Sequence, residues 1–223
     1  MGSVAEIGSR ERILGSIRRS LNAAGAAAIS EEVIAAEYAA IPRGYAGSSA
    51  LNGHDLLELF VERLVDYDAG VYRVGESAIA ATVAEILTKR GKSGLAIARG
   101  LPGEWLPEGF VFDEADGFTA QQLDRVEGIL SGCTAGIAET GSIVLQNAAA
   151  QGPRILSLVP DYHLCVVYAN QVVATVPEAF ARLEATSTLP TTFISGPSAT
   201  ADIEMTRIKG VHGPRFLDVV LVV

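Results

Sequence analysis

The feature that most constrains the fold is a regular alternation of amphipathic segments with short aliphatic runs. "HDLLELFVERLVDYDAG" and "GESAIAATVAEILTKRGKSG" have helical periodicity, and each is followed by an apolar run, "VYRV" and "LAIA". Helices that alternate with short apolar strands are typical of a parallel sheet covered by helices. Beyond residue 130 further aliphatic runs, "CTAGIA", "SIVLQ", "ILSLV", "LCVVYA", "TTFIS" and "LDVVLVV", suit buried strands, with one helical segment, "VPEAFARLEAT", among them. We predict an α/β domain over residues 54–223, with a mostly parallel sheet flanked by helices.

The first 53 residues do not continue this pattern. "SRERILGSIRRSLNAAG" places Ile13, Ile17 and Leu21 on one face of a helix, with arginines between them. The segment that follows loses periodicity and accumulates Pro, Gly and Ser, which is typical of a linker. We predict a helical amino-terminal arm and linker over residues 1–53. We expect its helix to pack either on the main domain or on a second copy of the chain. The sequence therefore leaves open whether the chain forms a homo-oligomer.

Composition and charge argue against several classes of protein. Hydrophobic residues make up 49% of the 223 residues and charged residues 19%, a balance typical of a globular protein. The formal net charge of −9 argues against a nucleic-acid partner, whose phosphates require a basic surface. No apolar run approaches the roughly 18 uncharged residues needed to cross a bilayer, and the first residues lack the pattern of a secretory signal. We therefore expect a cytoplasmic protein without a membrane span.

The two cysteines, Cys133 and Cys165, each lie inside an apolar run and outside any CxxC or Cys-His spacing. We expect buried, inert thiols, because an iron–sulfur cluster needs about four cysteine ligands. A metal site built from His163, His212 and a carboxylate stays open but is not favoured, since the histidines lack the helical i, i+4 spacing. GxGxxG, Walker and GxSxG motifs are absent from the sequence. We predict no cofactor and no metal.

Four polar clusters stand where apolar runs stop. They are "ETGS" at 139–142, "PDYH" at 160–163, "SGPSATADIE" at 195–204 and "VHGP" at 211–214. In open α/β sheets, ligands bind outside the carboxyl ends of the strands. We therefore expect these clusters to converge on one pocket at one rim of the sheet.

The first two clusters each allow a structural and a functional interpretation. "ETGS" is either a turn between two strands, with Gly141 at positive φ, or a site where Glu139 and exposed backbone N–H groups meet an anion. "PDYH" is either a turn capped by Asp161, or a pair in which Asp161 and His163 share one face and act as general base and orienting partner.

The third cluster predicts an anion site. Gly196-Pro197 forms a turn, Ser198 or Thr200 caps a short helix, and the N–H groups of the helix attract anions. Asp202 and Glu204 either complement the helix dipole or belong to the site.

The fourth cluster lies in a basic stretch of an acidic chain. In "RIKGVHGPR", Arg207, Lys209 and Arg215 surround His212. This stretch is either an ordinary solvated loop or a patch that binds a small carboxylate or phosphate.

Together the four clusters give two sets of candidates. The catalytic candidates are Glu139, Asp161, His163 and His212. The ligand-binding candidates are Thr140, Gly141, Ser195, Gly196, Ser198, Thr200, Asp202, Glu204 and Gly213.

The motifs "GIAETGSIVL", "LVPDYHLCVV", "SGPSATADIE" and "GVHGPR", in this order, resemble the lactate-utilisation protein C family, which carries the LUD domain. The resemblance implies a fold like that of the sugar-phosphate isomerase and CoA-transferase superfamily. It also implies a role in oxidising L-lactate to pyruvate, alongside two partner proteins that carry iron–sulfur clusters. This chain lacks the CxxCxxCxxxCP pattern of such partners.

Three functions follow from these observations. The first is a cofactor-free component of a lactate-oxidising system that binds a small anionic ligand or a partner. The second is a stand-alone enzyme of CoA-transferase or sugar-phosphate isomerase type. In that enzyme Glu139 is base or nucleophile, the 195–200 loop holds the anion, and His212 or His163 moves protons, by analogy with the fold. The third is a scaffold or regulator.

Overall fold

The computed structural model describes residues 8–23, 30–42, 44, 49, 51, 53–201, 207–209 and 213–223. The chain divides into two compact units, Met1–Tyr45 and Ala46–Val223, and the division falls inside the segment that we predicted as arm and linker. No helix in the described part is long and apolar enough to cross a membrane.

The first unit contains two helices. The helix expected around Ile13, Ile17 and Leu21 is α1 (Ser9–Ala23), and these three side chains are exposed. A second helix, α2 (Glu31–Ala40), lies in the segment where we expected only linker. It begins at Ser30, whose hydroxyl accepts the Val33 N–H. None of its residues is buried, so the sequence carries no apolar periodicity that would have indicated it.

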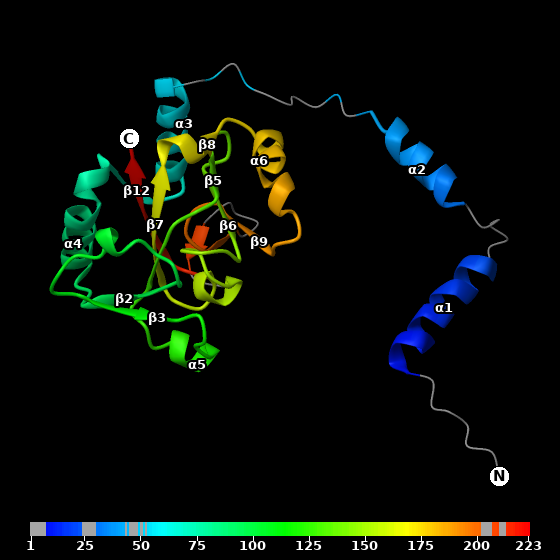
Figure 1. Ribbon diagram of the computed structural model, residues 1–223, viewed down its shortest axis with the longest axis horizontal. Helices are drawn as coiled ribbons and strands as arrows, with labels where there is room; N and C mark the ends of the chain where they lie inside the picture. The colour runs from blue at the N-terminus through cyan, green and yellow to red at the C-terminus, as the bar shows by residue number, and fades with distance from the viewer. Residues whose placement is uncertain are drawn as a thin grey trace, which may run out of the picture. The chain divides into compact units, whose positions relative to one another are not determined.

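The second unit is built on a six-stranded parallel sheet, which confirms the predicted fold class (Figure 1). The strand order is β1-β12-β7-β4-β2-β3, and every neighbouring pair is parallel. The strands are, in this order, Gly70–Val74, Phe216–Val222, Tyr162–Tyr168, Ile129–Ser131, Gly94–Ile97 and Val111–Glu114.

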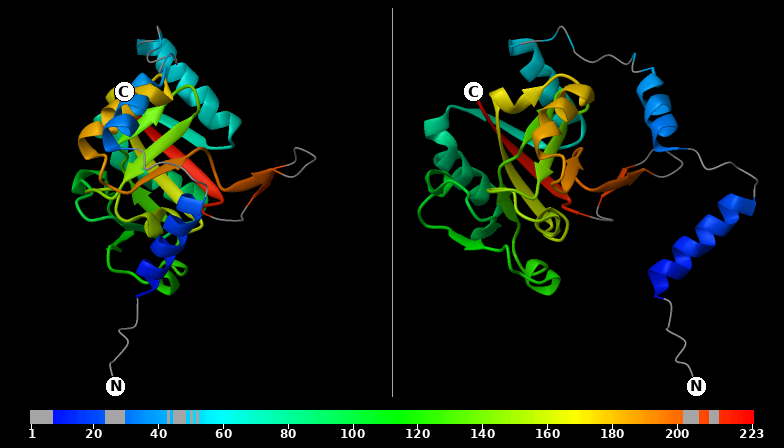
Figure 2. Two further views of the ribbon diagram at one scale, coloured as in Figure 1. Left: turned by 90° about the vertical axis from the view of Figure 1, so that its right-hand side faces the viewer. Right: turned by 45° about the vertical axis from the view of Figure 1, so that its right-hand side comes forward.

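A second, mixed sheet faces the first. Its order is β8-β5-β6-β9, and the strands are Val172–Val173, Ala135–Ile137, Ser142–Gln146 and Thr191–Ile194. The short strands β10 (Ala199–Ala201) and β11 (Arg207–Lys209) pair with each other and project away from both sheets (Figure 2). The sequence did not separate the sheets, because the buried strands of both have the same aliphatic composition.

The layers follow from the side-chain alternation of the strands (Figure 1). On the outer face of the parallel sheet, Leu164 and Val166 of β7 pack on α4 (Ile79–Arg90), which ends at Gly91 with φ +63°. On the inner face, Cys165 and Val167 pack on the second sheet and on α3 (Gly53–Asp66).

The remaining helices cover the second sheet and one end of the first. The helix α6 (Val176–Leu183) packs on the far side of the second sheet. It begins with the capping box of Thr175 and Glu178, and Pro177 stands in its first turn. The short helix α5 (Ala120–Leu123) packs beside η3 (Arg154–Ser157) on the inner face of the parallel sheet. The other 3-10 turns are Glu76–Ala78, Gly103–Trp105, Ala169–Gln171 and Glu184–Thr186.

A buried ion pair ties α4 to the centre of the parallel sheet. The Asp218 carboxylate on β12 is fully buried and accepts Nε–H and Nη2–H bonds from Arg90, both at 2.8 Å. The Tyr162 hydroxyl on β7 donates to the same carboxylate at 2.8 Å. Gly70 on β1 leaves the space for this carboxylate, because a Cβ there would lie 2.2 Å from Asp218 Oδ1.

Candidate functional site

A chain of hydroxyl groups joins two of the four polar clusters. Thr140 Oγ1 lies 2.8 Å from Ser142 Oγ, and Ser142 Oγ lies 2.6 Å from Ser195 Oγ. Ser142 is buried at the start of β6, and Ser195 is exposed at the end of β9. The antiparallel pairing of β6 with β9 brings them together.

The "ETGS" cluster is a tight turn between antiparallel β5 and β6, as the structural interpretation predicted. Gly141 has φ +59°, and a Cβ there would lie 2.7 Å from Arg63 Cβ on α3. The Gly141 N–H donates to the Ala138 carbonyl, and the Glu139 N–H donates to the Ala174 carbonyl. These two N–H groups are therefore used within the fold and are not free to bind an anion, while the Glu139 side chain is exposed.

The 195–198 loop forms one wall of a cavity of about 370 Å³. Residues of η3 also line it, as does Pro214, whose carbonyl accepts the Ser198 N–H at 2.7 Å. The predicted ligand-binding residues that line this cavity are Ser195, Gly196, Ser198 and Gly213. We call it the 195–198 cavity, and it is where these four predicted residues come together.

Arg154 is a residue of this cavity that the sequence analysis missed. It begins η3 and is the only charged residue among the described residues that line the cavity. Its side chain is exposed, and within the described ranges no carboxylate forms an ion pair with it. Arg154 lies outside the four clusters, so no sequence pattern singled it out.

Asp161 and His163 do not form the predicted base and orienting pair. The Asp161 carboxylate is exposed just before β7 and accepts two hydrogen bonds from Arg215, at 2.5 and 2.7 Å. The Arg215 guanidinium lowers the pKa of Asp161 below its ordinary value. His163 is fully buried on β7 and bonds to Ser131 instead. The two side chains therefore lie in different environments. Asp161 precedes the strand, where Arg215 and solvent compensate its charge, whereas His163 lies within the buried strand.

The clusters also do not all lie at carboxyl ends of parallel strands. Pro160-Asp161 and Gly213-Pro214 come just before β7 and β12, and Tyr162 and His163 begin β7, so both clusters stand at amino ends. The predicted strand "ILSLV" is instead the 3-10 turn η3 with Leu156 buried on the sheet, so the cluster after it follows no strand. Neither Glu139 nor His163 lines the 195–198 cavity.

Part of the third and fourth clusters lies outside the described residues. Asp202, Glu204 and His212 are among these, and only the backbone of Thr200 is described. That backbone belongs to β10, which pairs with β11, so the short helix expected after Ser198 is a strand. The predicted helix N-terminus for an anion is therefore absent from residues 199–201.

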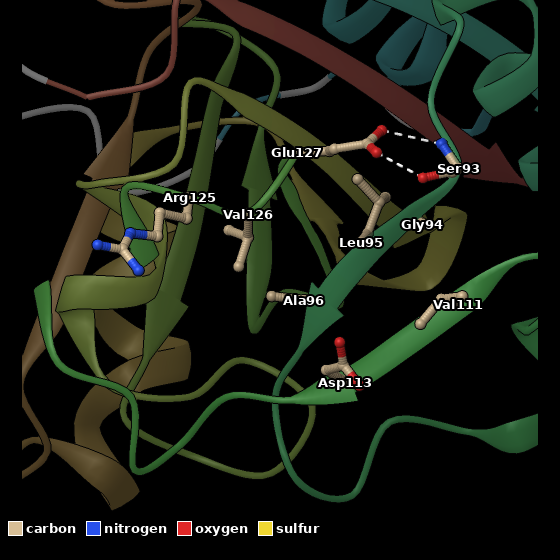
Figure 3. Close-up of a pocket in the computed structure, with 9 residues that line it drawn as sticks. All are labelled: Ser93, Gly94, Leu95, Ala96, Val111, Asp113, Arg125, Val126 and Glu127. Atoms are coloured by element: carbon tan, nitrogen blue, oxygen red, sulfur yellow. Dashed lines mark hydrogen bonds between the residues drawn. The ribbon is translucent and has the colours of Figure 1, made fainter. Parts of the chain in front are cut away.

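A second cavity, of about 210 Å³, lies over β2 and β3 and contains none of the predicted residues (Figure 3). Gly94 and Ala96 form its floor with Asp113. Both oxygens of the Glu127 carboxylate are held by Ser93, which donates its N–H at 2.8 Å and its hydroxyl at 2.5 Å. These bonds lower the pKa of Glu127. A carboxylate so fully engaged stabilises the loop before β4 and leaves little for a ligand.

The described residues contain no group of three or more His, Cys, Asp or Glu side chains arranged to hold a metal ion. The hydroxyl groups and the single arginine of the 195–198 cavity are ligand-binding groups, which suit a small polar molecule better than a metal.

A six-stranded parallel sheet, a facing mixed sheet and the helices that cover them define an α/β protein. The LUD domain model matches residues 57–222. The chain belongs to the LUD domain family, which confirms the resemblance drawn from the four motifs.

Individual relatives agree with this assignment. "Lactate utilization protein C" of Deinococcus radiodurans is 38% identical over 181 residues, covering 80% of this chain and 84% of the relative. "Uncharacterized protein YkgG" of Escherichia coli is 40% identical over 85 residues, 35% of this chain and 36% of the relative. The crystal structure of a DUF162 family protein from Deinococcus radiodurans has a TM-score of 0.68 at 33% identity, covering 78% of this chain and 99% of that one.

Proposed function

We propose that this protein is a component of a lactate-utilisation system and binds a small anionic ligand in the 195–198 cavity. The name of the Deinococcus relative, which this chain matches over 84% of its length, supports the pathway. The family motif that forms the cavity wall supports the site.

The position of Arg154 in the cavity is the observation from which we infer the chemical class of the ligand. Among the described residues the Arg154 guanidinium has no carboxylate partner, and a guanidinium next to hydroxyl groups binds carboxylate or phosphate through parallel N–H bonds. Ser195 and Ser198 line the same cavity and are suited to bind the remaining ligand oxygens. The volume of about 370 Å³ lies at the small end of the range for ligand sites, roughly 300–1,000 Å³. A hydroxy acid, a keto acid or a small phosphate ester fits this description.

The proposed role in oxidising L-lactate to pyruvate requires partners. The reaction releases two electrons and two protons, and a carrier must accept the electrons. Two cysteines are too few for an iron–sulfur cluster, which takes about four. We therefore assign electron transfer to iron–sulfur proteins of the same pathway and ligand binding to this chain.

Binding of L-lactate, pyruvate and inorganic phosphate by calorimetry tests the site. We expect at least one of these anions to bind the wild-type protein, and Arg154→Ala to weaken it by about ten- to a hundredfold, the value of a hydrogen bond to a charged group. Arg99→Ala is the matched control, because Arg99 is 79% exposed, makes only a 3.8 Å pair with Glu114 and lines no part of the cavity. Equal affinities for the three proteins, or no binding by the wild type, would refute the proposal.

The stand-alone enzyme is the second candidate. Glu139 is exposed beside Thr140, whose hydroxyl is linked through Ser142 to Ser195 at the cavity. In a CoA-transferase reaction its carboxylate would attack the acyl carbon of a CoA ester and release the CoA thiolate. The thiolate would then attack the glutamyl carbonyl of the anhydride formed, which gives a glutamyl thioester and releases the acyl group as its carboxylate. Mass spectrometry of the protein incubated with a panel of acyl-CoA esters tests this, with Glu139→Gln as the control. No adduct at Glu139 across the panel contradicts this function.

A further inference from the structure

The strand β9 forms one edge of the second sheet. It pairs with β6 on one side, and among the described residues no strand pairs with its other side, which we call the free edge (Figure 1). Its sequence, "TTFI", carries no charge. Edges of sheets are usually protected by charged side chains, by proline or by a covering segment, because their N–H and C=O groups pair readily with another chain. Here only Pro190, directly before the strand, offers such protection.

The register with β6 shows which backbone groups face the free edge. The Asn147 N–H donates to the Pro190 carbonyl, so the Pro190 carbonyl faces β6. Backbone groups of successive residues point to alternate sides of a strand, and those of Thr192 therefore also face β6. The N–H and C=O groups of Thr191 and Phe193 face the free edge.

A small apolar groove lies beside this edge, between β9 and α6. Phe180 of α6 and Phe193 of β9 stack with their ring centroids 5.7 Å apart, and they are 58% and 42% exposed. With Leu183 and Thr191 they line a groove of about 140 Å³, in which Glu184 is the one charged residue among the described lining. An exposed apolar patch of this kind marks a contact surface.

We propose that the chain forms a two-fold symmetric dimer in which β9 pairs antiparallel with β9 of a second copy. In the register centred on Thr192, Thr191 lies opposite Phe193 of the second copy. Because the backbone groups of both residues face the free edge, each N–H donates to the carbonyl of the other residue. The symmetry axis repeats this pair of hydrogen bonds, so every outward-facing backbone group of Thr191 and Phe193 is used.

The second copy is the occupant because the strand and the groove complement each other. Residues directly opposite in two paired strands place their side chains on the same face of the sheet. Phe193 of the second copy therefore lies beside Thr191, over the groove. An apolar cavity of about 150 Å³ accommodates a benzene ring, so the groove of about 140 Å³ has the size of a phenyl ring. The strand that supplies the hydrogen bonds also supplies the ring.

The exposed area is that of a weak dimer. With about 200 Å² for a fully exposed phenylalanine side chain, the exposed fractions of Phe180 and Phe193 amount to about 200 Å² per copy. This area forms the apolar centre of an interface, and the whole interface covers about 800 Å² per partner in stable complexes and less in weak ones. We expect a dissociation constant on the order of 10 μM.

The charge of the chain opposes this association. Each copy carries a net charge of −9, and salt screens the repulsion between copies. A contact made by apolar rings and backbone hydrogen bonds should therefore strengthen as the ionic strength rises, whereas a contact made by ion pairs should weaken.

The test is amide hydrogen exchange of the full-length protein at concentrations well below and well above this dissociation constant, together with sedimentation velocity. We expect the protein to change from monomer to dimer over this range. The exchange of the Thr191 and Phe193 amides should slow by about tenfold or more with the same concentration dependence, because these amides are hydrogen-bonded only in the dimer.

A lysine at the centre of the interface should prevent the contact. Phe193→Lys should weaken the dimer by about tenfold or more. Val111→Lys is the matched control, because Val111 is 60% exposed on β3, the edge strand of the parallel sheet, and the substitution changes the net charge equally. We expect this control to form the dimer as the wild type does.

The exchange of the wild-type amides decides the proposal even where a variant fails to fold. A monomer at every concentration would overturn it, and so would a dimer in which α1 or α2 becomes protected while Thr191 and Phe193 exchange unchanged. Equal dissociation constants for Phe193→Lys and the wild type, or a dimer that weakens with added salt, would also refute the contact that we propose.

Discussion

Asp218→Ala is the substitution that most directly tests how the parallel sheet is held together. The carboxylate is fully buried, whereas the Arg90 side chain that it binds keeps 30% of its surface in solvent. Removing the carboxylate leaves the Arg90 guanidinium uncompensated and the Tyr162 hydroxyl without its acceptor. Both losses fall at the contact between α4, β7 and β12.

The expected cost follows from these contacts. Removing one partner of a buried ion pair costs about 3–5 kcal/mol, and we expect the lower end because water reaches Arg90. The unsatisfied Tyr162 hydroxyl adds about 1 kcal/mol. Since domains are stable by only about 5–15 kcal/mol, Asp218→Ala should lower the free energy of unfolding by a large fraction. In urea, the midpoint should fall by about 1–3 M without a change in slope.

Two further variants separate this network from general sensitivity to substitution. Tyr162→Phe should cost about 1 kcal/mol alone and less in the Asp218→Ala background, because its acceptor is already gone. Glu114→Ala removes a pair of exposed side chains, 79% for Arg99 and 58% for Glu114, and should cost under about 1 kcal/mol. If Asp218→Ala is no more destabilising than Glu114→Ala, the reasoning on the buried pair is wrong.

Two other features give sharp expectations. Gly141→Ala should lower thermal stability by more than Gly109→Ala: both have positive φ, +59° and +84°, but a Cβ at Gly141 meets the backbone of Arg63 at 2.8 Å and one at Gly109 meets nothing within 4 Å. Equal shifts would show that the turn does not depend on this close approach. The carboxyl of Asp161 should titrate by NMR below 3.8 in the wild type and higher in Arg215→Ala. Because its folded pKa is depressed, the pair stabilises the protein above the unfolded pKa, and this contribution is lost as the pH falls through the folded pKa; equal titration in the two proteins would contradict the pairing.

The parallel sheet could be predicted because its signals are local. "VYRV" and "LAIA" are β1 and β2, and the helical periodicity before and between them belongs to α3 and α4. Local signals alone also produced the wrong prediction of a strand at "ILSLV". This segment contributes to η3 and buries Leu156 against the sheet, and a short apolar run looks the same in sequence whether a strand or a turn buries it. The second sheet was missed because its strands differ from those of the first only in their partners.

The residues that line the 195–198 cavity were predicted where one local motif carries them and missed where a distant segment supplies them. Ser195, Gly196 and Ser198 line the 195–198 cavity because one turn carries them all, whereas Arg154 enters from a segment with no motif.

The surroundings of the two cysteines show the same limit more strongly. The sequence predicted inert thiols from their aliphatic neighbours, and those neighbours are indeed the core around Cys133 and Cys165. What sets the chemistry of Cys165 is the pairing of β4 with β7, which places Ser131 opposite it and beside His163, 32 positions away along the chain. The ionisation of a thiol depends on the groups it touches. A single sequence gives the neighbours along the chain but not the register between strands. The polar surroundings of Cys165 therefore exist only at the level of the fold.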